Sequence, residues 1–392
     1  MTSATLAAGA IDQRPVASQI CVETVSEYRA FLDVEPVWNQ LVEAAEIDHP
    51  FLEHTWVRTW WECFGAGSAL QVLVVKAAGE PIAIAPLILT STRMWGIKIR
   101  RLGFFHNSHV PRADFIIASR REEVYRAIWR HLVRNRNWDV LQLCQLPAGS
   151  KILDAFSRLA ESDGYSTGVW CSGASPYLSL DTSWEQYFGS LATKHRSNLR
   201  NRFKRLKQVG PLELEALTSE AGLEEALETG LQLEAAAWKG AAGTAIACDK
   251  EVTHFYSALA MRAVERGWML LNFLRVGPQR VAFDYSLYYK NAIYVLKSGY
   301  DPAYSPYSPY NLLLTLVLEK AYAQGVTEYD FLGLAQEWKL SWTSQSVPHY
   351  WLFAFPPTAR GRFLHWIKFR LIPLLKHEAL SGLRNLLLHL MA

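Results

Sequence analysis

Residues 292–333 read AIYVLKSGYDPAYSPYSPYNLLLTLVLEKAYAQGVTEYDFLG and hold the most informative pattern in the chain. The apolar run at 292–298 predicts a buried strand that ends at Gly299. The apolar stretch at 312–323 predicts a helix, and 327–332 predicts a second strand. A strand, a loop, a helix and a strand in this order indicate an α/β fold.

The loop in this stretch has the features of a helix start. Ser308 stands directly before Pro309, a pair typical of an N-cap followed by proline at the first helical position. Such a start leaves backbone N–H groups and the positive end of the helix dipole beside the end of a strand, which suits a phosphate group. The alternative is a loop that only turns the chain.

Outside this stretch, both halves of the chain show helical periodicity, then a β-hairpin, then a helix and a buried strand. In the first half the expected elements are helices at 26–42, 54–64 and 122–134, and strands at 70–75, 82–87 and 138–143. In the second half they are helices at 183–208, 254–266 and 312–323, and strands at 269–275, 281–289, 292–298 and 327–332. The repeated order predicts an internal duplication of one α/β domain.

We therefore expect four segments along the chain. They are a flexible N-terminal arm at 1–19, a first domain at 20–175, a second domain at 176–358 and a basic amphipathic C-terminal tail at 359–392. The tail has two readings, a terminal helix docked on its own domain or a helix lying on an anionic membrane surface.

The composition narrows the class of protein. The 392 residues are 50% hydrophobic and 20% charged, with a formal charge of +3, which indicates a folded chain and excludes a protein that coats polyanions. Five scattered cysteines form no CxxC pair, so neither a zinc site nor a disulfide framework is expected. His106 and His109 have no nearby carboxylate or cysteine companion, and we predict no metal. The N-terminus lacks the pattern of a secretory signal, and we expect a cytoplasmic protein, with a peripheral position at the inner face of the membrane as an alternative.

Several short motifs together resemble the CelD/BcsL-type acetyltransferases of the GNAT superfamily, which are similar in build to the FemABX peptidyltransferases. The motifs in the second half are Lys297-Ser298-Gly299-Tyr300-Asp301, Ser308-Pro309, Leu312-Leu313, Gly325, Asp330-Phe331-Leu332-Gly333, Lys339 and Trp342. Upstream, Trp238-Lys239-Gly240 and Gly243-Thr244-Ala245-Ile246 fit the same family, as do Trp60-Trp61, Pro86-Leu87 and Trp138-Asp139 in the first half.

The resemblance implies an α/β fold with two tandem GNAT-like domains, each a mixed, mostly antiparallel sheet flanked by helices. It also implies acetyl-CoA or another acyl-CoA as co-substrate, held where two neighbouring parallel strands separate. By carry-over, the residues beside pantetheine are Tyr294, Val295, Leu296 and Lys297, and those beside the pyrophosphate are Ser308, Tyr310 and Asn311. The usual glycine-rich phosphate loop is absent, and Tyr310 stands where the family has a glycine.

Direct acyl transfer to an amine needs a base, because a lysine-like ammonium must lose its proton before it attacks. The candidate carboxylates are Asp284, Asp330 and Glu337. Asp330 interrupts an apolar strand and needs a partner, which Lys339 or Lys297 supplies in this reading; a purely structural ion pair is the alternative. Tyr300 (or Tyr304) is the candidate proton donor to the leaving thiolate.

The helix expected at 183–208 carries a second open question. It opens with a Thr182-x-x-Glu185 capping-box spacing and bears a stripe that includes Arg196, Arg200 and Lys204. The stripe is either a solvated face whose stems cover the core or a site for CoA phosphates, an acidic glycan or RNA.

Three functions remain open at this stage. The first is an acyl-CoA-dependent N-acyltransferase acting on an amino sugar or precursor in bacterial exopolysaccharide or cellulose biosynthesis, as the resemblance implies. The second is a FemABX-like aminoacyl-tRNA-dependent transferase, although nucleic acid is not the expected partner. The third is a non-catalytic subunit of polysaccharide machinery.

Overall fold

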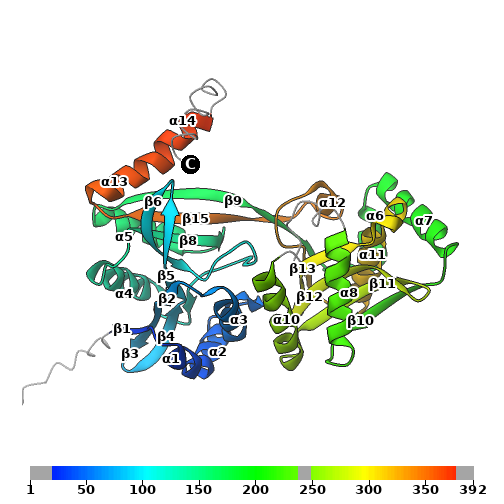
Figure 1. Ribbon diagram of the computed structural model, residues 1–392, viewed down its shortest axis with the longest axis horizontal. Helices are drawn as coiled ribbons and strands as arrows, with labels where there is room; N and C mark the ends of the chain where they lie inside the picture. Colours follow the sequence, from blue (N-terminus) through cyan, green and yellow to red (C-terminus); the bar gives the residue numbers. More distant parts are fainter. Residues whose placement is uncertain (1–19, 237–248, 377–392) are drawn as a thin grey trace, which may run out of the picture.

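The computed structural model describes residues 20–236 and 249–376 (Figure 1). The predicted arm at 1–19, the motifs at 238–246 and the end of the predicted tail lie outside the described residues.

The strands form two sheets. The smaller has the order β1-β3-β4-β7, with β1 (Ile20–Val25), β3 (Val72–Ala77), β4 (Glu80–Ala85) and β7 (Ile116–Ile117). The larger has the order β10-β11-β12-β13-β14-β9-β15-β8-β6-β5-β2. Its bounds are β2 (Ser68–Leu70), β5 (Leu87–Met94), β6 (Ile97–Phe104), β8 (Val140–Pro147), β9 (Ser166–Ser179), β10 (Leu212–Leu217), β11 (Met269–Val276), β12 (Gln279–Tyr289), β13 (Ala292–Tyr300), β14 (Glu328–Asp330) and β15 (Ser346–Phe355).

Helices cover both sheets (Figure 1). Those of the first half are α1 (Tyr28–Asp33), α2 (Glu35–Ala44), the 3-10 turn η1 (Pro50–Leu52), α3 (His54–Phe64), α4 (Arg121–Arg134) and α5 (Ile152–Ser162). Those of the second are α6 (Trp184–Ser190), α7 (Thr193–Lys207), α8 (Leu223–Ala236), α10 (Lys250–Glu265), η3 (Pro302–Tyr307), α11 (Pro309–Ala323) and α12 (Glu337–Leu340). The chain continues through α13 (Ala359–Trp366), the π-helical turn η4 (Ile367–Leu371) and α14 (Ile372–Lys376). Each half thus has a mixed, mostly antiparallel set of strands flanked by helices, as predicted.

One long strand connects the two halves. β9 pairs with β14 through its last residues and with β15 along most of its length, and β15 pairs in turn with β8. The predicted domain boundary at 175/176 lies inside β9, and β15, from the end of the second half, completes the sheet of the first. The division into domains stays a prediction.

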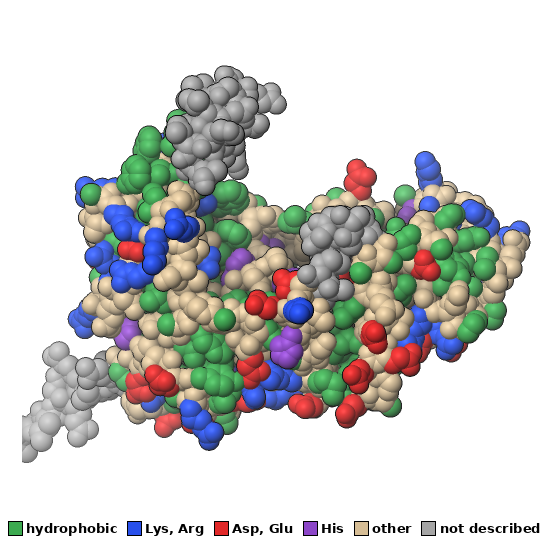
Figure 2. Space-filling view, in the orientation of Figure 1, with side chains coloured by type: hydrophobic (Ala, Val, Ile, Leu, Met, Phe, Trp, Pro, Cys, Tyr) green, Lys and Arg blue, Asp and Glu red, His purple; other side chains and the backbone are tan. Residues whose placement is uncertain are grey.

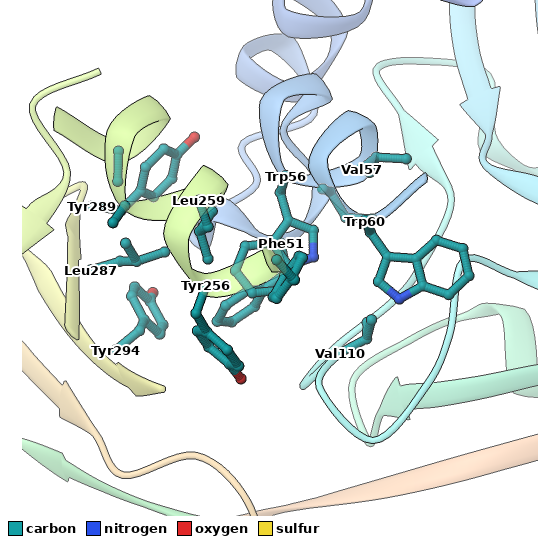
Figure 3. Packing of buried hydrophobic residues seen from close by; sticks show 14 of the residues in the cluster. Phe51, Trp56, Val57, Trp60, Val110, Tyr256, Leu259, Leu287, Tyr289 and Tyr294 are labelled. Carbon is teal, nitrogen blue, oxygen red and sulfur yellow. The ribbon is translucent and has the colours of Figure 1, made fainter. Parts of the chain in front are cut away.

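A shared core also holds the halves together. Phe51 and Trp56 belong to the same buried cluster as Tyr256, Leu259 and other residues of the second half (Figure 3). The rings of Trp56 and Phe255 meet edge to face at 5.6 Å. Burial of large aromatic rings from both sides stabilises their relative position, because such rings remove large apolar areas from water.

The helix predicted at 183–208 is two helices. Leu191 and Ala192 have extended ψ values, 151° and 133°, between α6 and α7. The predicted capping box is one residue out of register: the Ser183 hydroxyl accepts the Gln186 amide, and Gln186 reaches back to the Ser183 amide. In the described ranges, no helix has the length and apolar character needed to cross a membrane.

Candidate functional site

A cavity opens where β13 and β14 separate. The two strands pair in parallel at Ala292↔Glu328, Ile293↔Tyr329 and Tyr294↔Asp330, and the pairing then stops. Beyond this point lies a cavity of about 610 Å³, which we call the splay cavity. It is lined by Ser108, Glu234, residues 295–300, Ser305, Ser308, Tyr310, Asn311, residues 331–334, Gln336, Trp338 and Lys339.

Local irregularities in both strands produce the separation. On β13, the register with β12 shifts between Val295 and Lys297, so Leu296 is an extra residue that bends the strand. After β14, Leu332 and Gly333 have φ values of 48° and 56° and turn the chain away from β13. Left-handed backbone is unfavourable for leucine and needs support from its surroundings.

Asp330 and Lys339 supply that support. The Leu332 amide donates to Asp330 Oδ1 at 2.8 Å, and Lys339 Nζ donates to the Leu332 carbonyl at 2.5 Å. Asp330 is fully buried and does not line the splay cavity. Both residues were predicted to take part in catalysis, which stays untested; their contacts show that they hold the turn that opens the cavity.

The partner of Asp330 comes from the other half of the molecule. Arg112, in the loop between β6 and β7, donates to Asp330 Oδ2, whereas Lys339 or Lys297 was the expected partner. Burial raises the pKa of the Asp330 carboxyl, and the Arg112 charge and the Leu332 amide oppose that rise. The ion pair therefore couples the first half of the chain to the turn beside the splay cavity.

The predicted phosphate site at the start of α11 differs in detail from expectation. Ser308 is the N-cap residue, but it has φ 46° and its side chain makes no capping hydrogen bond. The amides of Asn311 and Leu312 donate to the Ser308 carbonyl, and Pro309 has no N–H. Of the amides in this first turn, that of Tyr310 has no such bond. Ser308, Tyr310 and Asn311 all line the splay cavity, as the prediction requires.

The Tyr310 side chain points into the protein. It is 8% exposed, and its ring meets that of Trp338 edge to face at 5.3 Å. Its hydroxyl is close enough to those of Ser298 and Tyr329 for each to affect its pKa, which burial raises far above the ordinary value. The bulk of tyrosine at the position of the family's glycine is thus accommodated under α11.

Asp284 lies at the inner end of this polar cluster. The Asn272 amide and the Ser286 hydroxyl both donate to its Oδ1, at 2.9 and 3.0 Å. Its Oδ2 and the hydroxyls of Tyr310 and Tyr329 have no partner in hydrogen-bonding geometry among the described residues. Burial raises the pKa of Asp284 to about 6, and the two hydrogen bonds to Oδ1 oppose that rise. Register pairs Asp284 with Ser298, which lines the splay cavity, so this carboxyl lies one strand away from the cavity lining.

A second cavity of about 220 Å³ adjoins the first, and we call it the inter-half cavity. Both are lined by Ser108, Leu296, Lys297 and residues 332–334. The rest of its wall is Val110, Pro111, His109, Gln145, residues 172–175, Tyr256 and His349. Side chains from both halves therefore surround the end of the splay cavity.

The remaining predicted site residues are not all brought together. Val295, Leu296, Lys297 and Tyr300 line the splay cavity. Tyr294 is buried on the opposite side of β13, where its hydroxyl donates to the Asp48 carbonyl at 2.8 Å. Glu337 is exposed at the start of α12 and lies outside the lining.

Sequence reasoning missed Arg112, Ser298, Trp338 and His349. Ser298 and Trp338 lie within the motif region, and their neighbours were the available signal. Arg112 and His349 are distant in sequence, and no local pattern distinguishes them. His106 and His109 take part in ring contacts, with Trp351 and Tyr256. Within 20–236 and 249–376, no group of three His, Cys, Asp or Glu residues is placed to hold a metal ion.

The part of the chain that forms this cavity is similar to a known protein family. Residues 193–340 match the family described as "Acetyltransferase (GNAT) domain". The match lies in the second half of the chain and shows that this part is similar to that domain. The match includes every residue of the splay cavity's lining except Ser108. No curated protein matches the chain.

Two solved structures show a similar fold over most of their length. FemX superposes with a TM-score of 0.57 at 11% identity, covering 83% of this chain and 98% of FemX. A conserved protein of unknown function from Bacteroides thetaiotaomicron VPI-5482 superposes with a TM-score of 0.54 at 10% identity, covering 86% of this chain and all 100% of that one. At these identities the likeness shows the fold alone. It confirms that the arrangement extends over both halves.

Proposed function

We propose that this protein is an N-acyltransferase that transfers an acyl group from acyl-CoA to an amine in the splay cavity. The observation that carries the proposal is that, among the described residues, the pairing of β13 with β14 stops after Tyr294. A strand edge offers a row of N–H and C=O groups to any extended chain that carries amides. Pantetheine is such a chain, and the cavity beside this edge leads to the first turn of α11.

The residues around the cavity have different roles in this proposal. The β13 edge at 295–299 orients the pantetheine amides, and the Tyr310 amide with the α11 dipole attracts the pyrophosphate. Bound acyl-CoA supplies an electrophilic thioester carbonyl; when the amine attacks it, the C–N bond forms, the C–S bond breaks and CoA leaves as a thiolate, which Tyr300 of the cavity lining protonates. Ser298 and Tyr310 convey the proton of the attacking amine inward to Asp284, whose pKa of about 6 leaves it ionised at neutral pH.

The acceptor enters through the inter-half cavity in this proposal. Hydroxyl, amide and imidazole groups of Ser172, Ser175, Gln145 and His349 line it. His349 is 3% exposed, and burial with the nearby Arg112 charge lowers its pKa to about 4, so it is neutral at pH 7. Neutral polar groups suit a hydroxyl-rich amine. An amino sugar, or its precursor in exopolysaccharide or cellulose biosynthesis, fits this wall and the CelD/BcsL-type resemblance. Acetyl is the proposed acyl group.

Calorimetry with acetyl-CoA tests the donor site. We expect micromolar binding to the wild type and at least about fivefold weaker binding to Ser308→Asp, because like charges at ~4 Å repel by ~1 kcal/mol even in water. The matched control is Ser119→Asp, which puts the same charge before α4 in the first half. No binding to the folded wild type contradicts the acetyl-CoA proposal, and equal weakening by both variants contradicts its placement at α11.

Aminoacyl-tRNA is the second candidate donor, because α7 carries an exposed basic face and the fold is similar to that of FemX. Lys194, Arg200, Lys204 and Arg205 are all exposed. If this face binds tRNA specifically, the affinity for tRNA should fall steeply as the salt concentration rises, and binding should be lost in the Arg200→Gln/Lys204→Gln variant. Salt-insensitive or undetectable tRNA binding excludes this candidate.

A further inference from the structure

The end of the first half away from both cavities carries a helix with two contrasting sides. α13 and η4 pack on the outer face of β9 and β15, where Leu364, Phe353 and Phe355 form a small buried cluster (Figure 1). The π-helical turn η4 precedes Pro373, which cannot donate a backbone hydrogen bond. The helical segment continues past Pro373 to Lys376, and Leu364 and Ile367 on its inner side are buried.

Its outer side exposes large apolar groups. Phe363 and Trp366 are 50% and 48% exposed, with stacked rings at 6.5 Å, and Leu374 is 58% exposed. Trp170 of β9, on the side of the sheet that α13 covers, is 40% exposed. Four of the eleven large apolar side chains exposed in the described residues therefore lie on one surface. Concentration of this kind is typical of a contact with a partner or a membrane.

Basic side chains surround these apolar groups. Arg360, Arg362 and Arg370 are exposed on the same helical segment, and Lys368 lies over the Trp170 ring at 4.3 Å. Arg360 also donates to the Lys98 carbonyl, so the basic group extends onto β6 with Lys98 and Arg100. Figure 2 shows Lys and Arg gathered beside exposed hydrophobic side chains at this end of the molecule. Asp139, which contacts Arg100 and Arg360, is the acidic residue among them.

We propose that this surface, the α13 face, binds an anionic lipid bilayer. It is defined by Trp170, Phe363, Trp366 and Leu374 with Arg360, Arg362, Lys368 and Arg370. Charge complementarity decides the occupant. Aromatic rings at the level of the headgroups, ringed by arginine and lysine, match an interface that is apolar below and negatively charged above.

The chain contains its own comparison. α7 carries more Lys and Arg residues than the α13 segment, but its large apolar residues are fully buried (Leu199 and Leu206) or half-buried (Phe203). It lies at the opposite end of the molecule (Figure 1). Attraction by charge alone would act at either helix, whereas insertion requires the exposed rings that the α13 face has. Binding there leaves both cavities uncovered, so the proposal is independent of the acyl transfer.

Vesicle flotation of the full chain tests the proposal. The wild type is expected to float with phosphatidylcholine vesicles that contain phosphatidylglycerol and to remain in solution with phosphatidylcholine alone. Phe363→Ser/Trp366→Ser removes the rings and should abolish flotation. Arg362→Gln/Arg370→Gln should weaken partitioning by roughly fivefold for each charge removed. Circular dichroism and thermal melting check that each variant folds, which is expected because all four side chains are exposed.

The matched control is Arg200→Gln/Lys204→Gln on α7, which removes the same charge at the far end and should float like the wild type. Equal loss in this control shows charge attraction without a defined surface and overturns the proposal. Failure of the wild type to float also overturns it. So does a wild-type oligomer, seen by light scattering, that the Phe363→Ser/Trp366→Ser variant does not form, because the surface is then an interface between copies.

Discussion

The two halves contain the same arrangement with different outcomes. In each, a parallel strand pair is joined through a crossover that includes a helix: β6 and β8 with α4, and β13 and β14 with α11. In the first half, the chain after β6 folds back, and the Ala113 amide donates to the Gln145 carbonyl at the end of β8. In the second half, the corresponding strand edge faces a cavity of about 610 Å³.

The N-terminal turns of α4 and α11 show a corresponding difference between the halves. α4 has Glu122 and Glu123 in its first turn, and Glu123 forms an ion pair with the N-cap residue Arg120. α11 has no acidic residue in its first turn and borders the splay cavity. Carboxylates at a helix start take the place of an external anion. The order of elements thus produces the same arrangement of strands and helix in both halves. A site forms only where other residues do not cover the strand edge and the helix start.

We expect the largest effect when the Arg112–Asp330 ion pair between the two halves is removed. Arg112→Ala leaves Asp330 buried without its partner and should reduce the free energy of unfolding by about 3–5 kcal/mol. Urea denaturation measures this. Because burial raises the pKa of Asp330 in the folded state, its protonated form tolerates burial at low pH and stability is lost as pH rises. The destabilisation should therefore be larger at pH 8 than at pH 5, and a loss that does not change with pH contradicts the assignment.

A smaller effect distinguishes the two buried carboxyls whose pKa values are raised to about 6, Asp284 in the second half and Asp114 in the first. With an amine acceptor, the wild-type rate should rise with pH through about 6 as Asp284 ionises. Asp284→Asn should lower kcat roughly a hundredfold and remove that rise. Asp114→Asn should keep the wild-type profile. Identical profiles for all three proteins rule out Asp284 as the proton acceptor.

The smallest effect concerns the turn after β14. Gly333→Ala forces alanine into φ 56° and should cost about 1 kcal/mol in the free energy of unfolding, with weaker acyl-CoA binding. Gly67→Ala, at φ 75° in the first half, should cost a similar amount of stability and leave binding unchanged. Equal binding in both variants shows that the turn does not shape the donor site.

Local sequence predicted several elements of both halves. The helix at 54–64 and the strands at 269–275, 281–289 and 292–298 agree closely with α3, β11, β12 and β13. Their periodicity is strong because each faces a core on a fixed side. β9 and β15 were not predicted, since their partners lie in the other half and their alternation reflects exposure that only the assembled sheet defines.

For the site, the sequence by itself supplied the chemical inventory: a strand, a Ser-Pro helix start and, through the family resemblance, Val295, Leu296, Lys297 and Tyr300 of the cavity lining. The tertiary structure decided the rest. It gave Asp330 a partner from Arg112, buried Asp284 beside Tyr310 and Tyr329, and placed Tyr294 and Glu337 away from the cavity. The physical reason is the distance along the chain over which each effect acts. Helix and strand propensity and hydrophobic periodicity depend on residues that are close in sequence. Burial, pKa and ion pairing depend on neighbours that only the folded chain brings together.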